Sequence, residues 1–357
     1  MCHRHALFCI IPPYIIERLA HSSNPRVRAC AIANLQASSH LRAQRSAAQA
    51  LPGLMANRSP TGEKNRLVYD ARHTANLPGT LVRREGEAGV EDEAVNEAYE
   101  GAGVTYDFYE QVFGRHSLDD QGMSLISSVH VAEPSYDNDP PAPLNNAFWN
   151  GQQMAYGDGD GEIFGRFTQA LEVIAHELTH GVQSFTSNLA YHGQPGALNE
   201  HFADVFGVLV RQWSLGQAVD NASWLIGDEV LIPSPTRRGI RDMENPGTAY
   251  VDDPDLGSDP QPAHMKDIYS GTADSGGVHI NSGIPNRAFV LVAKALGGQA
   301  WEVAGRIWYA TMLQLSANSD FQACASVSAQ VAQARFGAAE KRAVVAAWKK
   351  VGITLQG

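Results

Sequence analysis

The chain has 357 residues, of which 44% are hydrophobic, so it can bury a large core and is expected to divide into two domains. Its formal net charge of −11 argues against nucleic acid or an anionic membrane as a partner and favours solubility. No run approaches the roughly eighteen apolar residues that span a bilayer, so we predict no transmembrane segment. We also expect the protein to be a monomer.

The N-terminal fifty residues differ in composition from the rest of the chain. Residues 1–14 are basic and apolar, but Pro12 and Pro13 interrupt the apolar run, and no cleavage site of a signal peptide follows. We therefore expect a cytoplasmic protein or one secreted by a non-standard route. Residues 22–49 are partly helix-forming, and residues 51–62 read as an exposed linker, which predicts a domain boundary near residue 50.

The next hundred residues mix strand-like and helical patterns. The turn Gly157–Gly161 alternates glycine and aspartate as calcium loops do, but Ile163 and Gln169 stand where an EF-hand needs Gly and Glu. We therefore predict a tight glycine turn there. The predicted elements are strands at 67–69, 80–82, 124–131, 145–150 and 153–157, and helices at about 92–113, 286–296, 300–315, 321–336 and 338–351.

The stretch His176-Glu-Leu-Thr-His180 has the H-E-x-x-H pattern. On a helix, positions four apart lie one turn above each other, so both imidazoles can reach one metal ion. Glu177 is offset around the helix, where a carboxylate can accept a proton from water without ligating the metal. A stripe of apolar residues with helical spacing supports a buried helix: Leu171, Ile174, Ala175, Leu178 and Val182.

A five-residue motif also occurs by chance, so its neighbourhood decides between chance and a metal site. A catalytic zinc ion needs three protein ligands and one open position. Glu200 provides a third ligand, and Asp204, one turn later, is predicted to orient a ligating histidine.

Four segments together resemble the thermolysin family of neutral zinc metalloproteases, from about residue 66 to the end. They are His176–His180, Asn199–Asp204, Asn145–Asn150 and Asp274–Gly283. The resemblance implies an α+β fold with a β-rich N-terminal lobe, a mainly helical C-terminal lobe and the zinc helix between them.

The stretch Cys9–Tyr14 resembles the protealysin-like branch of that family, in which a propeptide of about fifty residues precedes the enzyme. We therefore expect a propeptide at 1–50, a β-rich catalytic lobe including the zinc helix at 51–184, and a helical lobe at 185–357. The zinc aminopeptidases are a rival family, but they have one residue fewer between the second histidine and the distal glutamate. Their G-x-M-E-N motif precedes the zinc helix, whereas Met243–Asn245 follows it here.

The resemblance also implies individual roles. Glu177 would be the general base, Tyr191 and His279 would stabilise the oxyanion, and Asp274 would orient His279. A buried core tyrosine and a structural histidine are the ordinary alternatives. Asn199 would hold His180 in place as its partner, and a role as a turn or helix-cap residue is nearly as good an interpretation.

Substrate contacts follow from the same resemblance. Arg241 would hold a substrate carbonyl, with a surface ion pair as the alternative. Asn146 and the backbone of Ala147 would pair with the substrate as an added strand. The pocket for the residue just after the scissile bond would be apolar, which predicts a preference for Leu, Phe or Ile. Its expected members are Phe164, Phe167, Val173 and Ile240.

The family's double calcium site is predicted to be absent or reduced. Glu172 and Asp228 match two of its acidic residues, but Arg211, Ser223 and Leu225 stand where further ligands are expected. A cation cannot ligate calcium, so we expect Arg211 to pair with Glu172, Asp228 or both.

The N-terminal segment is expected to inhibit the enzyme and to be removed by it. Pro12 and Pro13, followed by Tyr14, favour an extended segment that resists cleavage. Cys9 either binds the zinc as a thiolate or packs as a small apolar residue. The bonds before Leu51 and Leu54 fit the predicted specificity and are the expected cuts. The alternative function is a catalytically silent zinc protein that serves as a binding or scaffold module.

Overall fold

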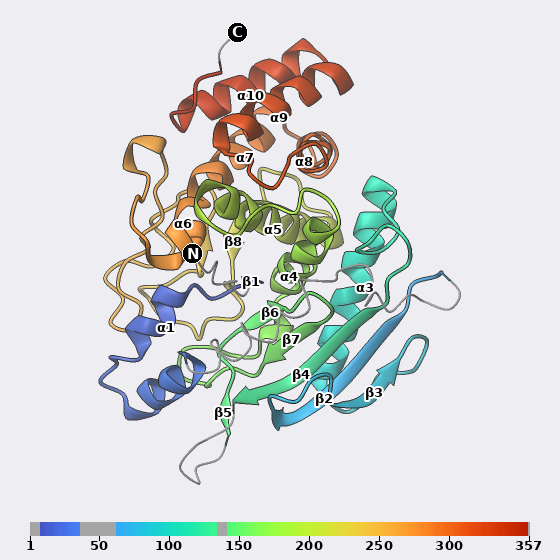
Figure 1. The fold of residues 1–357 in the computed structure, drawn as a ribbon, viewed down its shortest axis with the longest axis vertical. Coiled ribbons are helices and arrows are strands. Elements are labelled where there is room, and N and C mark those ends of the chain that lie inside the picture. The colour runs from blue at the N-terminus through green and yellow to red at the C-terminus, as the bar shows by residue number, and fades with distance from the viewer. Residues whose placement is uncertain (1–7, 36–61, 134–140, 356–357) are drawn as a thin grey trace.

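The computed structural model describes residues 8–35, 62–133 and 141–355, and the remaining residues are drawn as a grey trace in Figure 1. Expectations for the linker, including the bonds before Leu51 and Leu54, lie outside the described residues. No helix in the described part of the chain is long and apolar enough to cross a membrane.

One mixed sheet forms the N-terminal lobe. Its strand order is β1-β6-β7-β4-β2-β3, with β5 paired to β4. The β4 strand is parallel to both β2 and β7, and the other pairs are antiparallel. The bounds are β1 Phe8–Cys9, β2 Arg66–Thr74, β3 Thr80–Arg84, β4 Leu125–Glu133, β5 Ala142–Pro143, β6 Ala147–Trp149 and β7 Met154–Gly157.

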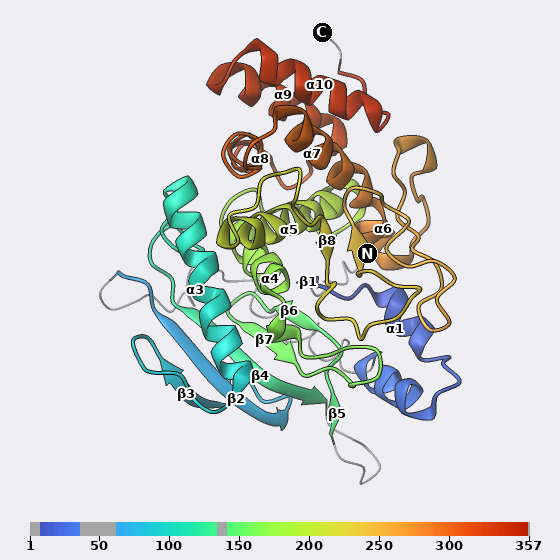
Figure 2. The same cartoon turned by 180° about the vertical axis from the view of Figure 1, so that it is seen from behind.

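A long helix, α3 (Glu93–Phe113), lies along this sheet (Figure 2). Asp92 caps its first turn by accepting from the N–H groups of Ala94 and Val95, and Gly114 ends it in the left-handed conformation. Tyr99, Tyr106 and other buried residues of α3 join the core. The helix begins and ends within a residue of the predicted range 92–113.

The zinc helix α4 (Leu171–Ser184) and its neighbour α5 (Gly193–Ser214) lie between the sheet and the C-terminal helices (Figure 1). The expected two-lobe α+β architecture is therefore confirmed. The remaining elements are 3₁₀ turns η1 Phe167–Gln169 and η2 Met265–Asp267, strands β8 Leu225–Ile226 and β9 Arg241–Asp242, and helices α6 Ala273–Asn281, α7 Gly283–Leu296, α8 Ala304–Met312, α9 Phe321–Arg335 and α10 Ala338–Lys350.

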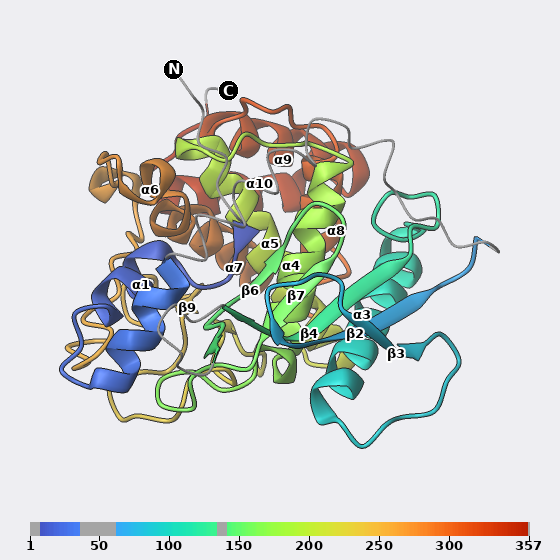
Figure 3. The same cartoon turned by 60° about the horizontal axis from the view of Figure 1, so that its bottom comes forward.

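The N-terminal segment packs on the body of the protein on the side where α6 and β9 lie (Figure 3). The β1 strand pairs antiparallel with β6. Buried in the core cluster that includes residues of both lobes are Ile10, Ile11 and Ile15. The expectation that Pro12 and Pro13 are both extended is wrong for Pro13. Pro12 is extended, whereas Pro13 opens helix α1 (Pro13–Leu19), because the first helical position needs no N–H donor. Residues 25–35 form a further helix.

Candidate active site

Three predicted ligands meet at one point between α4 and α5. Nε2 of His176 lies 3.1 Å from Nε2 of His180, and these atoms lie 3.5 and 3.6 Å from the carboxylate oxygens of Glu200. Ligand atoms at about 2.0–2.1 Å from a tetrahedral zinc ion stand roughly 3.3–3.4 Å apart, so the spacing fits zinc. All three side chains are fully buried.

In both ligating histidines, Nδ1, the ring nitrogen that is not directed at the metal position, faces a side-chain oxygen. Nδ1 of His176 lies 2.9 Å from Oδ1 of Asp204, and Nδ1 of His180 lies 2.8 Å from Oδ1 of Asn199. A proton held on each Nδ1 leaves the two Nε2 lone pairs facing each other beside the carboxylate of Glu200, and this arrangement calls for a cation. Burial lowers the pKa of His176, but Asp204 and Glu200 raise it to about 9, so this position favours positive charge.

The close approach of α5 to α4 depends on Gly207. A Cβ at this position would stand 2.7 Å from the carbonyl oxygen of Glu172 and 3.4 Å from Cβ of His176. The glycine therefore allows the two helices to pack closely enough for Glu200 to reach both histidines.

Glu177 is fully buried, and its Oε2 accepts the backbone N–H of Trp149 at 3.0 Å. This bond ties the carboxylate to β6, the strand that is expected to bind substrate. Glu177 is absent from the group of residues whose atoms lie close enough together to share a metal ion. Glu177 directly follows His176 in α4, and a carboxylate that does not ligate the metal can serve as a general base.

Tyr191 and His279 both contact Glu200. The Tyr191 hydroxyl donates a short hydrogen bond to Glu200 and lies 3.2 Å from Nε2 of His279. Nδ1 of His279 lies 2.6 Å from Oδ1 of Asp274, whose Oδ2 accepts the backbone N–H of His279 at 2.8 Å. Burial lowers the pKa of His279, but Asp274 and Glu200 raise it to about 9. Burial, with Glu200, raises the pKa of Tyr191 well above its ordinary value, so its hydroxyl keeps its proton.

Asp274 reaches His279 because the backbone turns sharply at the start of α6. Residues 274–277 all have positive φ, with Asp274 at 52° and ψ at 43°. Left-handed conformations cost free energy for non-glycine residues and persist where the surroundings fix them. The turn directs the Asp274 carboxylate at the N–H groups of His279 and Ile280.

Arg241 is fully buried, so its alternative as a surface ion pair is excluded. Its Nε and Nη2 bind the two carboxylate oxygens of Asp204 at 2.9 and 2.7 Å. Its Nη1 donates to the carbonyl oxygen of Ile10 at 2.9 Å. Burial raises the pKa of Asp204, but Arg241 and His176 together lower it far below its ordinary value, which keeps Asp204 ionised.

Residues 9–11 lie against β6 and the residue before it, with Cys9 ending β1 and a bend at Ile10 and Ile11. Ile10 donates its N–H to the carbonyl oxygen of Ala147 at 3.3 Å, and Ile11 donates its N–H to Oδ1 of Asn146 at 3.0 Å. The carbonyl oxygen of Cys9 lies 3.0 Å from Nε2 of His279. The N-terminal segment thus occupies every backbone contact that the sequence assigned to a substrate.

The Cys9 side chain packs in a small apolar cluster with Phe148 and Ala155. Among the described residues, the metal-capable group at this site consists of His176, His180 and Glu200 and does not include Cys9. Burial, with a smaller effect of Glu177, raises the pKa of the Cys9 thiol, which disfavours a thiolate. The packing alternative is therefore favoured over zinc ligation.

The four expected pocket residues are apolar and at most 1% exposed, and they belong to the core cluster that contains Ile10. The Phe164 and Phe167 rings lie 5.9 Å apart, centroid to centroid.

At the position of the expected calcium ligands, Arg211 lies 3.1 Å from Glu172 and 2.7 Å from Asp228. The Gly157–Gly161 turn is tight, since Oδ1 of Asp160 accepts backbone N–H groups at 162–164.

Sequence reasoning missed two contacts in this site. Asn286 of α7 donates to Oδ2 of Asp204 at 2.8 Å, and the Trp149 N–H binds Glu177. Neither has a local signal, because Asn286 is 82 residues from Asp204 and the Trp149 donor is a backbone group. The two ring nitrogens of His201, which follows Glu200, form hydrogen bonds with Asn286 and Trp308, so this histidine has a structural role.

Comparison with known proteins identifies the family. Residues 55–184 match the thermolysin metallopeptidase catalytic domain, and residues 187–353 match the thermolysin metallopeptidase alpha-helical domain. The chain belongs to the thermolysin family. It is 46% identical over 355 residues to the Extracellular metalloprotease of Pectobacterium carotovorum subsp. carotovorum, covering 97% of this chain and 96% of that protein.

Two further relatives of this thermolysin-family chain are informative. Protease PrtS of a Photorhabdus species is 48% identical over 296 residues, covering 82% of this chain and 77% of that protein. The solved structure of the precursor of protealysin, a metalloproteinase from Serratia proteamaculans, matches with a TM-score of 0.86 and 46% identity, covering 97% of this chain and 99% of that one. The expected likeness to the protealysin-like branch is confirmed.

The thermolysin-family protein is a zinc metalloendopeptidase with a propeptide, and His176, His180 and Glu200 are the residues that can hold its metal ion. The alternative of a silent zinc protein gains no support, since Glu177, Tyr191 and the Asp274–His279 pair are all at the site. Of the two locations expected, the cytoplasmic one is wrong, because relatives named extracellular proteases point to secretion, with which the non-standard route is compatible.

Proposed function

We propose that this enzyme cleaves peptide bonds on the N-terminal side of large hydrophobic residues and is held inactive by residues 1–50. The observation that carries the proposal is the position of the Cys9–Ile10 peptide bond. The carbonyl oxygen of Cys9 faces His279, and Ile10 binds Ala147 through its N–H and Arg241 through its carbonyl oxygen. A substrate needs the same groups, so propeptide and substrate exclude each other.

The catalytic roles follow from this orientation. Zinc, when bound, supplies a Lewis acid that activates water and polarises the scissile carbonyl group. Glu177 takes the proton from the attacking water and passes it to the leaving amine. Protonated His279 and the Tyr191 hydroxyl donate to the oxygen that develops negative charge, and Asp274 keeps His279 protonated and oriented.

Substrate preference is set by the residue just after the scissile bond. In the propeptide that residue is Ile10, which is fully buried. The buried pocket side chains offer no charge, so Leu, Phe and Ile gain free energy there and charged side chains would lose their hydration. Arg241 and Asn146 both hold the peptide group that follows that residue, Arg241 through the carbonyl oxygen of Ile10 and Asn146 through the N–H of Ile11.

The proposed domains are a propeptide at 1–50, a catalytic lobe at 51–184 that includes the zinc helix, and a helical lobe at 185–357. The enzyme would remove the propeptide at the bond before Leu51 or Leu54 and act as a secreted monomer without nucleic acid as a partner. Cleavage-site mapping on a mixed peptide pool, with and without a zinc chelator, tests the substrate preference. Chelator-sensitive cuts before Leu, Phe and Ile support the proposal, and a profile dominated by charged residues contradicts it.

A further inference from the structure

Two histidines outside the catalytic cleft sit at irregular positions of the sheet. His73 in β2 and His130 in β4 both have a φ of 54°. The register of β2 against β4 shifts between Asp70 and Thr74, and β4 has a second shift against β7 around His130. Positive φ is uncommon for non-glycine residues, and bulges of this kind re-aim side chains. Here they bring the two imidazole rings to a centroid distance of 5.3 Å.

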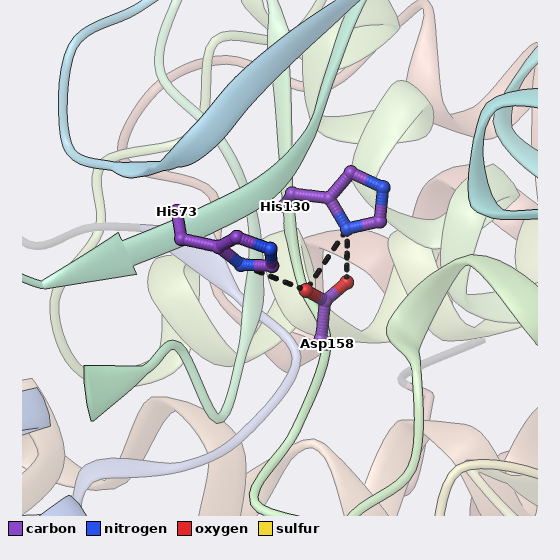
Figure 4. A group of neighbouring side chains, drawn as sticks. All are labelled: His73, His130 and Asp158. Carbon is purple, nitrogen blue, oxygen red and sulfur yellow. Dashed lines mark hydrogen bonds and ion pairs between the residues drawn. The ribbon is translucent and has the colours of Figure 1, made fainter. Parts of the chain in front are cut away.

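Both rings face the carboxylate of Asp158, which follows β7 (Figure 4). Nδ1 of His130 lies 3.0 and 2.9 Å from its two oxygens, and Nδ1 of His73 lies 3.5 Å from Oδ2. One ligand atom from each of these residues lies within 4.8 Å of the others. Three side chains of metal-binding type, from two strands and a loop, therefore converge on one point.

The backbone on either side of Asp158 is fixed. Gly157 donates its N–H to Asn146 at 3.0 Å, and Gly159 donates its N–H to Leu144 at 3.3 Å. A Cβ at Gly159 would stand 2.4 Å from the carbonyl oxygens of residues 164 and 165, so the loop has little freedom. Asp160 in the same turn is used internally to bind backbone N–H groups, whereas Asp158 is directed at the histidines.

The second nitrogen of His130 is also engaged. Its Nε2 lies 2.8 Å from Oδ2 of Asp92, whose Oδ1 caps α3. Histidines that bind metal commonly donate their other N–H to a carboxylate, which fixes the tautomer and orients the ring. His130 thus has the arrangement of a ligating histidine, with Asp92 as its orienting partner.

We propose that His73, His130 and Asp158 bind a second zinc ion on the N-terminal lobe, separate from the catalytic ion. Two imidazoles and one carboxylate are a zinc-type ligand set, and water would complete the coordination. Exposure favours entry of the ion, since the side chain of His73 is 63% exposed and that of Asp158 is 24% exposed. The ion would join β2, β4 and the loop after β7 to the N-terminus of α3.

An ion-pair network without a metal is the competing account. Asp158 raises the pKa of His130 to about 9, so a proton on Nδ1 occupies the site when zinc is absent. Zinc binding displaces that proton. The role of His73 separates the two accounts, because its contact with Asp158, at 3.5 Å and largely exposed, adds little as an ion pair.

The test is equilibrium dialysis of the full chain, already holding its catalytic zinc, against buffered free zinc, followed by metal analysis. Arg72→Ala is the matched control, because Arg72 precedes His73, is exposed and has a similar φ of 52°. The unmodified chain and Arg72→Ala should bind an additional zinc ion. His73→Ala should bind it at least roughly 10-fold more weakly, because one of three protein ligands is missing.

A second measurement is the thermal midpoint with and without added zinc. Zinc should raise it in the unmodified chain and in Arg72→Ala, with the increase lost in His73→Ala. Equal binding of additional zinc by His73→Ala and Arg72→Ala would overturn the proposal, as would the absence of additional zinc in the unmodified chain. His73→Ala should retain catalytic zinc, which verifies that it is folded.

Discussion

Replacing Arg211 by methionine tests whether a buried cation holds together the place where the family binds calcium. The guanidinium group lies 3.1 Å from Glu172 and 2.7 Å from Asp228, and it also donates to the carbonyl oxygen of Leu225 at 2.7 Å. The side chains of Arg211 and Glu172 are 7% and 0% exposed. Methionine keeps much of the side-chain volume but leaves the Glu172 carboxylate buried without its cation.

Removing one member of a buried ion pair costs about 3–5 kcal/mol. The Asp228 side chain is 27% exposed and can turn to water, so we expect the lower end of this range, about 3 kcal/mol. The assay is urea unfolding at pH 7 of full-length chains that also carry Glu177→Ala, which prevents self-digestion. Arg84→Met is the control, because the Arg84–Glu87 pair is 63% and 48% exposed and should contribute at most about 1 kcal/mol.

The stability loss caused by Arg211→Met should also depend on pH. Burial raises the pKa of Glu172, and Arg211 opposes that rise, so Arg211→Met should raise this pKa further. A carboxyl group with a raised folded-state pKa lowers stability when ionised, and this loss is absent below the unfolded value of about 4.3. The deficit of Arg211→Met should therefore shrink as pH falls from 7 towards about 4.5. A deficit no larger than that of Arg84→Met, or strong stabilisation of the unmodified chain by calcium, would refute the reasoning.

Three further predictions concern the site. Asp204→Ala should weaken zinc binding about 10–100-fold, measured by competition with a chelator, because His176 loses its orienting partner; unchanged affinity would contradict that role. His279→Ala should lower kcat by roughly 10²–10³ with zinc retained, because an oxyanion donor is lost; a change in KM alone would argue against this. Leu and Phe after the scissile bond should be preferred over Ala in kcat/KM, since one added methylene in an apolar pocket contributes about 1–3 kcal/mol, and equal rates would contradict the apolar pocket.

Contacts set by helical spacing could be predicted from the sequence. The i, i+4 relation of His176 to His180, and of Glu200 to Asp204, fixes which side chains share a face of α4 and α5. The position of Arg211 near Glu172 followed from the family resemblance. These features depend on local geometry or on a motif with constant spacing, so they need no knowledge of the distant chain.

Contacts between distant segments could not be predicted in this way. The pairing of Ile11 with Asn146 spans 135 residues, and no local pattern encodes it. The convergence of His73, His130 and Asp158 depends on one register shift between β2 and β4 and another between β4 and β7, which the alternation of apolar residues does not reveal. Pro13 was misread because a proline is compatible both with extended backbone and with the first turn of a helix.

The central claim is that the catalytic centre built around Glu177 removes the propeptide docked in its own cleft. The most direct measurement follows the size of purified full-length chains over time, with and without Glu177→Ala, while zinc content is determined in parallel. The unmodified chain should convert to a shorter, active species. Glu177→Ala should keep its zinc, stay full length and be trimmed only when active enzyme is added. Processing of Glu177→Ala at the unmodified rate, or full activity of the unprocessed chain, would contradict the account.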